Sequence, residues 1–80
     1  MPRERNQLLI DAFAQVLRAA RARAEQTQED LAFTAGIDRT FVGLLETGKR
    51  QPSLSVVFAL AEALGTTPES LVKDTRKLMA

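Results

Sequence analysis

The stretch AGIDRTF, residues 35–41, places two hydrogen-bonding side chains at the start of a short predicted helix. Gly36 is typical of a helix end, because glycine adopts a left-handed backbone without a steric penalty. Asp38 is typical of a helix start, because its carboxylate can accept hydrogen bonds from free amides. Only a tight turn fits between these two residues. Arg39 and Thr40 therefore occupy the first turn of the second helix, where a long cation and a hydroxyl can both bind a ligand.

The side chains that most enzymes use for catalysis are scarce. The chain has no histidine, cysteine or tyrosine, which excludes His-based triads, zinc fingers and a disulfide framework. It has no glycine-rich phosphate loop, and its carboxylates are scattered as helix caps and surface charges. We therefore expect no catalytic residues, no metal site and no cofactor, and we do not expect an enzyme.

Length and charge set broad limits on the protein. Its 80 residues predict a single domain over residues 1–80. A core of this size is marginal, so oligomerisation would help stability. The net charge is only +1, with 11 basic and 10 acidic residues, and such a balance does not by itself indicate a nucleic-acid partner. A claim of that kind depends on where the charges lie.

The sequence also bears on location. No apolar run reaches the length that a transmembrane helix needs. The first residues, MPRERNQ, lack the apolar segment of a signal peptide. We expect a soluble cytoplasmic protein with no membrane partner and no small-molecule ligand.

Hydrophobic periodicity and capping residues predict five helices and no strands, an all-α fold. The first helix runs from about Asn6 to Ala24, and one face of it is apolar: Leu9, Phe13, Val16, Leu17, Ala20 and Ala24. The second begins at Thr27, where TQED has the form of a capping box, and ends at Gly36. The third runs from Asp38 to about Glu46 and is ended by Gly48.

Two further helices follow the basic turn KRQPS. Ser53 caps the fourth, whose predicted buried stripe is Leu54, Val57, Phe58, Ala61 and Leu64. Thr67 caps the fifth, Pro68 is its first residue, and it carries an apolar row: Leu71, Val72, Thr75, Leu78 and Met79. This row suits either the core or a symmetric dimer interface. We expect both, with Leu71 in the core and Leu78 and Met79 at a partner, so that segment 67–80 contributes to dimerisation.

The second and third helices, with the tight turn between them, have the form of a helix-turn-helix. Many small helical bundles contain such a turn, so a longer match is needed. TQEDLA, AGIDRT, LETGKRQPS and LAEALG occur in order, and together they resemble the XRE-type (Cro/lambda-repressor-like) helix-turn-helix domain over about residues 13–72. The DRT sequence followed by an aromatic residue also resembles controller proteins of restriction–modification systems. The resemblance implies a five-helix lambda-repressor-like DNA-binding bundle from a mostly bacterial and phage family.

The resemblance assigns roles to the positions that match the family. DNA base contacts are implied for Arg39, Thr40, Phe41 and Leu44. Backbone contacts are implied for Thr27, Gln28, Gly43, Lys49 and Arg50. Arg21 and Glu46 match a partly buried ion pair that links the first helix to the third. Phe41 suits core packing equally well.

The physical chemistry agrees with these roles. The N-terminal residues of a recognition helix meet base edges in the major groove. Arg39 could donate two hydrogen bonds to a guanine, which contributes about 1–3 kcal/mol of discrimination. Gly43 has no side chain and Leu44 is apolar, so the surface that can read bases is small. Our hypothesis is modest direct readout, supplemented by DNA shape.

The sequence therefore favours a sequence-specific regulator of transcription. It would bind double-stranded DNA as a homodimer on a palindromic operator and regulate its own gene, with RNA polymerase as a candidate partner. The alternative is an antitoxin-like protein-interaction module with secondary DNA binding. Toxin-binding segments usually need chain beyond the DNA-binding core, which argues against that alternative. The operator sequence, and the choice between activator and repressor, stay open.

Overall fold

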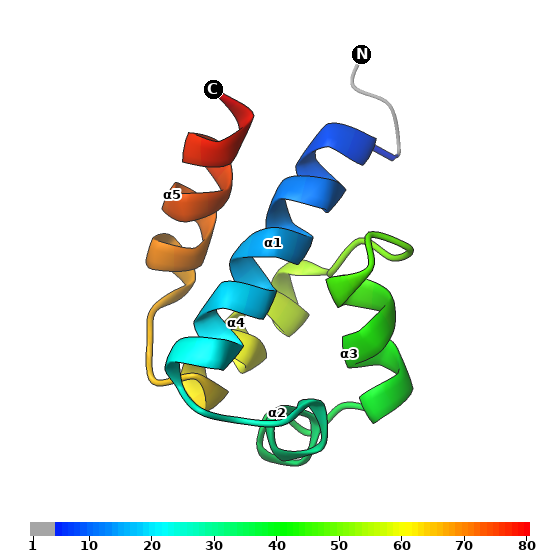
Figure 1. The fold of residues 1–80 in the computed structure, drawn as a ribbon, viewed down its shortest axis with the longest axis vertical. Helices are drawn as coiled ribbons and strands as arrows, with labels where there is room; N and C mark the ends of the chain where they lie inside the picture. Colours follow the sequence, from blue (N-terminus) through cyan, green and yellow to red (C-terminus); the bar gives the residue numbers. More distant parts are fainter. Residues whose placement is uncertain (1–4) are drawn as a thin grey trace.

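The computed structural model describes residues 5–80, which form five α-helices and no strand (Figure 1). The helices are α1 (Gln7–Arg23), α2 (Gln28–Ala35), α3 (Arg39–Glu46), α4 (Leu54–Ala63) and α5 (Pro68–Met79). This confirms the predicted all-α fold with a helix-turn-helix at the second and third helices. The domain boundary predicted at residue 1 lies outside the described residues.

Side-chain caps begin four of the helices. Asn6, Thr27, Ser53 and Thr67 each accept a hydrogen bond from an amide of the first turn. At Thr27 the capping box is complete, and the hydrogen bonds from Thr27 hold the pKa of Asp30 below its usual value. Asp38 occupies the N-cap position of α3, but its side chain makes no capping hydrogen bond. The expectation that its carboxylate caps the helix was therefore wrong.

The core lies where α1 meets α3 and α5, and where α4 meets α2 and α5. Each helix contributes apolar side chains that are almost completely buried, among them Leu17, Leu31, Val42, Leu45, Leu60 and Leu71. Burying each such side chain contributes about 1.5–3 kcal/mol. The α2–α3 pair therefore has a fixed position relative to the other three helices.

The predicted buried face of α4 was partly wrong. Val57 and Ala61 are buried, but Leu54 is 71% exposed and Phe58 is 56% exposed. Leu60 is fully buried instead. The reason is that apolar residues occupy almost every position of LSVVFALAEA, so periodicity does not choose a face. Packing against α2 and α5 decides which residues are buried.

The ends of α1 also differ from the prediction. Leu9, assigned to its apolar face, is 37% exposed, and Ala24 is only partly buried. The chain leaves α1 through Glu25, whose φ of 55° lies in the left-handed region without a glycine to favour it. None of the helices in residues 5–80 combines the length and hydropathy needed to cross a membrane.

Candidate nucleic-acid interface

The turn between α2 and α3 presents the start of α3 at the surface. Gly36 has a φ of 74°, which glycine adopts without strain, and this reverses the chain after α2. Ile37 then packs against the core and Asp38 returns to extended backbone. Arg39 and Thr40, the next two residues, are both exposed. The structure therefore places these two side chains at the exposed N-terminal end of α3.

The residues of α3 divide into an inner and an outer face. Val42, Leu45 and Glu46 are buried. Thr40, Gly43 and Leu44 follow one another at helical spacing on the other side, with Gly43 and Leu44 partly exposed. Phe41 packs against the core while part of it stays exposed, so core packing explains its burial.

A chain of hydrogen bonds connects Arg39 to the interior. Arg21 on α1 donates to both carboxylate oxygens of Glu46, through Nε at 2.6 Å and Nη2 at 3.0 Å. The Nε2 atom of Gln28 donates to Glu46 Oε1 at 2.9 Å. Arg39 Nη1 donates to Gln28 Oε1 at 3.4 Å, a longer contact. The predicted ion pair is thus present, and Gln28 links it to the first residue of α3.

This network fixes the C-terminal end of α3, where Glu46 is the last residue. The Glu46 side chain is only 3% exposed, whereas that of Arg21 is 23% exposed. Hydrogen bonding to Glu46 raises the pKa of Arg21 above its already high value, against the effect of burial. Arg21 also donates to the main-chain carbonyl of Gln26 at 2.9 Å, and Arg18 donates to that of Glu46. Helices α1, α2 and α3 are therefore joined by polar contacts as well as by the core.

A shallow depression of about 570 Å³ brings several predicted residues together. Arg21, Thr27, Gln28 and Arg39 line it, and so do two acidic residues, Glu25 and Glu29. The amides at the start of α2 lie beside it, and a helix N-terminus favours an anion. The depression therefore combines two guanidinium groups with a helix N-terminus, while the two acidic residues reduce its positive potential.

Lys49 and Arg50 lie at the opposite end of α3. Both are exposed, and the Lys49 amide donates to the carbonyl of Leu44 at 2.9 Å. Four of the five predicted backbone-contacting residues therefore form two groups: Thr27 and Gln28 on the side of Arg39, and Lys49 and Arg50 after the end of α3. The fifth, Gly43, lies on the exposed face of the helix between them.

Comparison with known proteins identifies the family. A model of the helix-turn-helix domain matches residues 12–73. The chain belongs to the helix-turn-helix domain family. The match includes every residue of the hydrogen-bond network and the exposed face of α3.

Two relatives of this helix-turn-helix protein are control proteins. Control protein C.BamHI of Bacillus amyloliquefaciens is 34% identical over 64 residues, which cover 79% of each chain. The crystal structure of the restriction–modification controller protein C.AhdI from Aeromonas hydrophila is 42% identical, with a TM-score of 0.75. That match covers 78% of this chain and 94% of C.AhdI. The resemblance to controller proteins is therefore confirmed.

A third structure shares the fold at lower identity. The controller protein C.Esp1396I, solved as a tetramer in complex with its natural 35 base-pair operator, has a TM-score of 0.81. It is 22% identical, and the match covers 89% of this chain and 93% of that one. C.Esp1396I, a different protein with this fold, therefore binds operator DNA.

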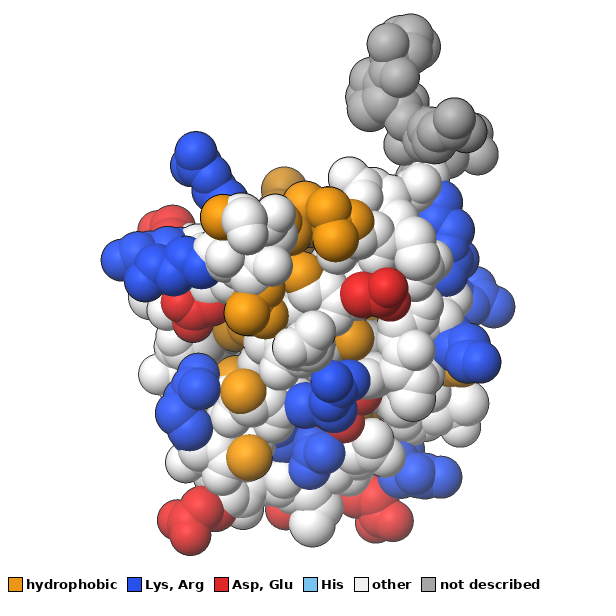
Figure 2. All heavy atoms as spheres, turned by 45° about the horizontal axis from the view of Figure 1, so that its top comes forward, with side chains coloured by type: hydrophobic (Ala, Val, Ile, Leu, Met, Phe, Trp, Pro, Cys, Tyr) orange, Lys and Arg blue, Asp and Glu red, His pale blue; other side chains and the backbone are white. Residues whose placement is uncertain are grey.

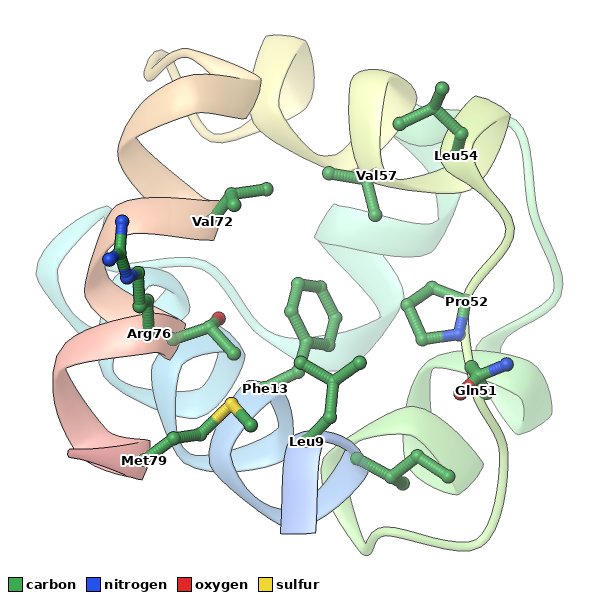
Figure 3. A pocket seen from close by; sticks show the side chains of 11 residues that line it. Leu9, Phe13, Gln51, Pro52, Leu54, Val57, Val72, Arg76 and Met79 are labelled. Atoms are coloured by element: carbon green, nitrogen blue, oxygen red, sulfur yellow. The ribbon is translucent and has the colours of Figure 1, made fainter. Parts of the chain in front are cut away.

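A second surface of this helix-turn-helix protein is apolar. A groove of about 500 Å³ lies between α1, α4, α5 and the loop before α4, and we call it the apolar groove. Phe13 and Val57 lie in it, and Leu54, Val72 and Met79 border it (Figure 3). Figure 2 shows hydrophobic side chains gathered where the ends of α1 and α5 come forward, with basic side chains to both sides.

The two residues predicted at a dimer interface do not share one surface. Met79 lines the apolar groove. Leu78 is 51% exposed and lines a different depression, together with Val16, Arg23 and Asp74. Adjacent residues on a helix point about 100° apart, which explains the separation. Of the other α5 residues of the row, Leu71 and Thr75 are buried and Val72 is exposed.

The sequence analysis missed several residues that support the surface. Arg18 was not singled out, although it donates to the carbonyl of Glu46. Arg5 and Gln7 were not singled out either, although both bind the loop after α3. Their partners lie far along the chain and are main-chain carbonyls, so no pattern of residue types could indicate them.

Proposed function

We propose that this protein is a sequence-specific, double-stranded DNA-binding regulator of transcription, built as a single helix-turn-helix domain. The observation that carries the proposal is the exposed start of α3. Arg39 and Thr40 are exposed and accessible to a ligand. The rest of α3 is held by the core and by the hydrogen bonds that Arg21 and Gln28 donate to Glu46. In this family of motifs the first residues of the second helix contact base edges in the major groove.

The dimensions of α3 support this proposal. An α-helix with its side chains is about 10–12 Å across, which fits the roughly 12 Å width of the major groove. Thr27 and Gln28 at one end, and Lys49 and Arg50 at the other, would then contact phosphates on opposite sides of the groove. Thr40 and Leu44 would face the bases, and Gly43 would let the helix backbone approach closely.

We also propose that the protein acts as a homodimer on a palindromic operator. The apolar groove supports this, because a second copy would bury side chains that now face water. Two recognition helices about 34 Å apart would read half-sites one DNA turn apart. The surfaces for DNA and for the second copy use different residues, so one copy can use both.

The likeness to control proteins supports a regulatory circuit in which the protein controls its own gene. C.BamHI and C.AhdI are each named as control or controller proteins. We propose that the present protein binds upstream of its own gene in the cytoplasm. Occupancy there would change the access of RNA polymerase to the promoter.

The test is fluorescence anisotropy with the DNA upstream of the gene and with a scrambled duplex, at two salt concentrations. Arg39→Ala is compared with Arg23→Ala, which removes the same charge from an exposed position on α1. We expect wild type and Arg23→Ala to prefer the upstream duplex. Arg39→Ala should lose about tenfold or more of that preference, because one bidentate base contact contributes about 1–3 kcal/mol.

Two results would contradict the proposal. Equal, weak binding of wild type to the upstream duplex and to the scrambled duplex would indicate a protein partner instead, as in the antitoxin-like alternative. An Arg39→Ala variant that keeps the full preference would show that α3 does not read the bases through Arg39.

A further inference from the structure

Polar residues at the start of α1 hold the loop that follows α3. Gln7 Nε2 donates to the carbonyl of Gly48 at 3.1 Å and to Asp11 Oδ1 at 2.8 Å. Arg5 Nη2 donates to the carbonyls of Gly48 and Lys49 at 3.2 and 3.1 Å. Arg5 Nε donates to Gln7 Oε1 at 3.0 Å. We call Arg5, Gln7 and Asp11 the α1 clamp.

The clamp requires a glycine in the loop. Gly48 is buried and has a φ of 72°. A Cβ at this position would lie 2.5 Å from Asp11 Oδ1, which is closer than such atoms approach. From the other side, the amides of Lys49 and Arg50 both donate to the carbonyl of Leu44. The loop backbone is therefore fixed from α1 and from α3, while the side chains of Lys49 and Arg50 stay exposed.

We propose that the α1 clamp positions Lys49 and Arg50 for contact with DNA phosphates. This inference rests on the proposed function. Three hydrogen bonds from the clamp to two consecutive carbonyls, two amide bonds to the Leu44 carbonyl and one buried glycine define where the loop leaves α3. A loop held in this way does not have to be ordered when DNA binds, so less binding free energy is lost. Gln7, at the centre of the clamp, is a positioning residue.

Gln7 is the residue to change, because Arg5 is itself an exposed cation and could contact a phosphate directly. Gln7→Glu removes the amide donor and places a second carboxylate beside Asp11 and the Gly48 carbonyl. Gln15→Glu is the matched control, since Gln15 is an exposed glutamine on the same helix and the charge change is identical. Gln7→Met and Gln15→Met form an uncharged pair for use if Gln7→Glu does not fold.

The measurement is the affinity for the upstream duplex as a function of salt. We expect Gln7→Glu to bind about tenfold more weakly than Gln15→Glu, because the hydrogen bonds of Gln7 Nε2 to the Gly48 carbonyl and to Asp11 are lost. The slope of log affinity against log salt should become shallower by roughly one to two, since each phosphate contact contributes about 0.9. Equal affinity and slope for the two variants would overturn the proposal.

A double-mutant cycle separates positioning from a general structural effect. In a Lys49→Ala/Arg50→Ala background, Gln7→Glu should cause no further loss of affinity, because its effect passes through those two side chains. Additive losses would overturn the proposal.

A readout without DNA distinguishes this inference from the proposed function. The heteronuclear NOE of the Gly48 and Lys49 amides should fall in Gln7→Met and stay unchanged in Gln15→Met. Unchanged values in Gln7→Met would refute the clamp, whatever the protein binds. The NOE values could also fall in Gln7→Met while wild type binds no upstream duplex. That result would refute the proposed function and the phosphate contacts, and it would support only the contact between the α1 clamp and the loop.

Discussion

Glu46 is the residue that most strongly links the candidate surface to the interior. Its side chain is 3% exposed and accepts two hydrogen bonds from Arg21 and one from Gln28. A buried carboxylate loses its hydration, and only such partners compensate for that loss. The net stabilisation from the pair is therefore small, while the geometry that it imposes on α1, α2 and α3 is specific.

Removal of this carboxylate should therefore destabilise the fold through the partner that it leaves behind. We expect Glu46→Ala to lower the free energy of unfolding by about 3 kcal/mol, because Arg21 is then partly buried without a counter-charge. Combining it with Arg21→Met should recover part of the loss, since no unpaired cation remains. Urea denaturation followed by circular dichroism measures both values.

The stability of the double variant relative to Glu46→Ala gives the sign of the coupling between Arg21 and Glu46. A double variant that is clearly less stable than Glu46→Ala would show that Arg21 stabilises the fold by itself. Its bond to the carbonyl of Gln26 could then be the cause. Both variants should also bind the upstream duplex more weakly, because Gln28 loses the partner that fixes it beside Arg39.

At the scale of the elements, the helix-turn-helix contains two glycines that are present for different reasons, Gly36 and Gly43. No heavy atom outside the local chain lies within 4 Å of where a Cβ would be, at Gly36 or at Gly43. Only the backbone differs, because Gly36 has a φ of 74° and Gly43 is inside α3. Alanine should therefore have opposite effects at the two positions.

We expect Gly43→Ala to raise the free energy of unfolding by about 1 kcal/mol, through its better helix propensity. Gly36→Ala should lower it by about 1 kcal/mol, because a side chain disfavours the left-handed region. Thermal or urea unfolding gives both values. Gly43→Ala should nevertheless weaken DNA binding if that face approaches a phosphate. A stabilised variant with unchanged affinity would argue against a contact at Gly43.

Local signals predicted the ends of the elements well and their faces less well. Thr27, Gly36, Ser53 and Pro68 mark helix ends in the structure as they do in the sequence, because capping is decided by residues a few positions apart. The face of α4 was not predictable, since nearly all of its residues are apolar. Nothing in the sequence marked Glu25, where a left-handed residue ends α1 without a glycine.

The same distinction applies to the candidate site. The family pattern paired Arg21 with Glu46, and this ion pair is present. The contact between Gln28 and Arg39 was not predicted and comes from the structure alone. The α1 clamp escaped prediction, because its bonds run from side chains to carbonyls 41 to 44 residues away. Side chain to main chain contacts of this range depend on the complete fold and carry no periodic signal.

At the scale of the whole molecule, the two candidate surfaces belong to different elements. The DNA surface is formed by α2, α3 and the loop after them, and the apolar groove by α1, α4, α5 and the loop before α4. A second copy seated on the groove would therefore leave Arg39 exposed. Dimerisation and DNA binding should then be separable by mutation, which a domain with one shared surface would not allow.

The sharpest test uses two residues of α5 that are almost equally exposed. Val72 is 54% exposed and borders the apolar groove, whereas Leu78 is 51% exposed and lies at the other depression. An aspartate at either position should cost the monomer little. If the groove is the dimer interface, Val72→Asp buries an unpaired carboxylate on association and should raise the dimer dissociation constant about 100-fold.

Sedimentation equilibrium of wild type, Val72→Asp and Leu78→Asp decides between the two sides of α5. We expect Leu78→Asp to remain a dimer, and Val72→Asp to be a folded monomer that binds a single half-site as well as it binds the palindrome. The reverse pattern would move the interface to the depression beside Leu78, because the two variants carry the same charge at similar exposure. A wild-type monomer at all concentrations would remove the dimer from the proposal, while binding through α3 would still be tested separately by Arg39→Ala.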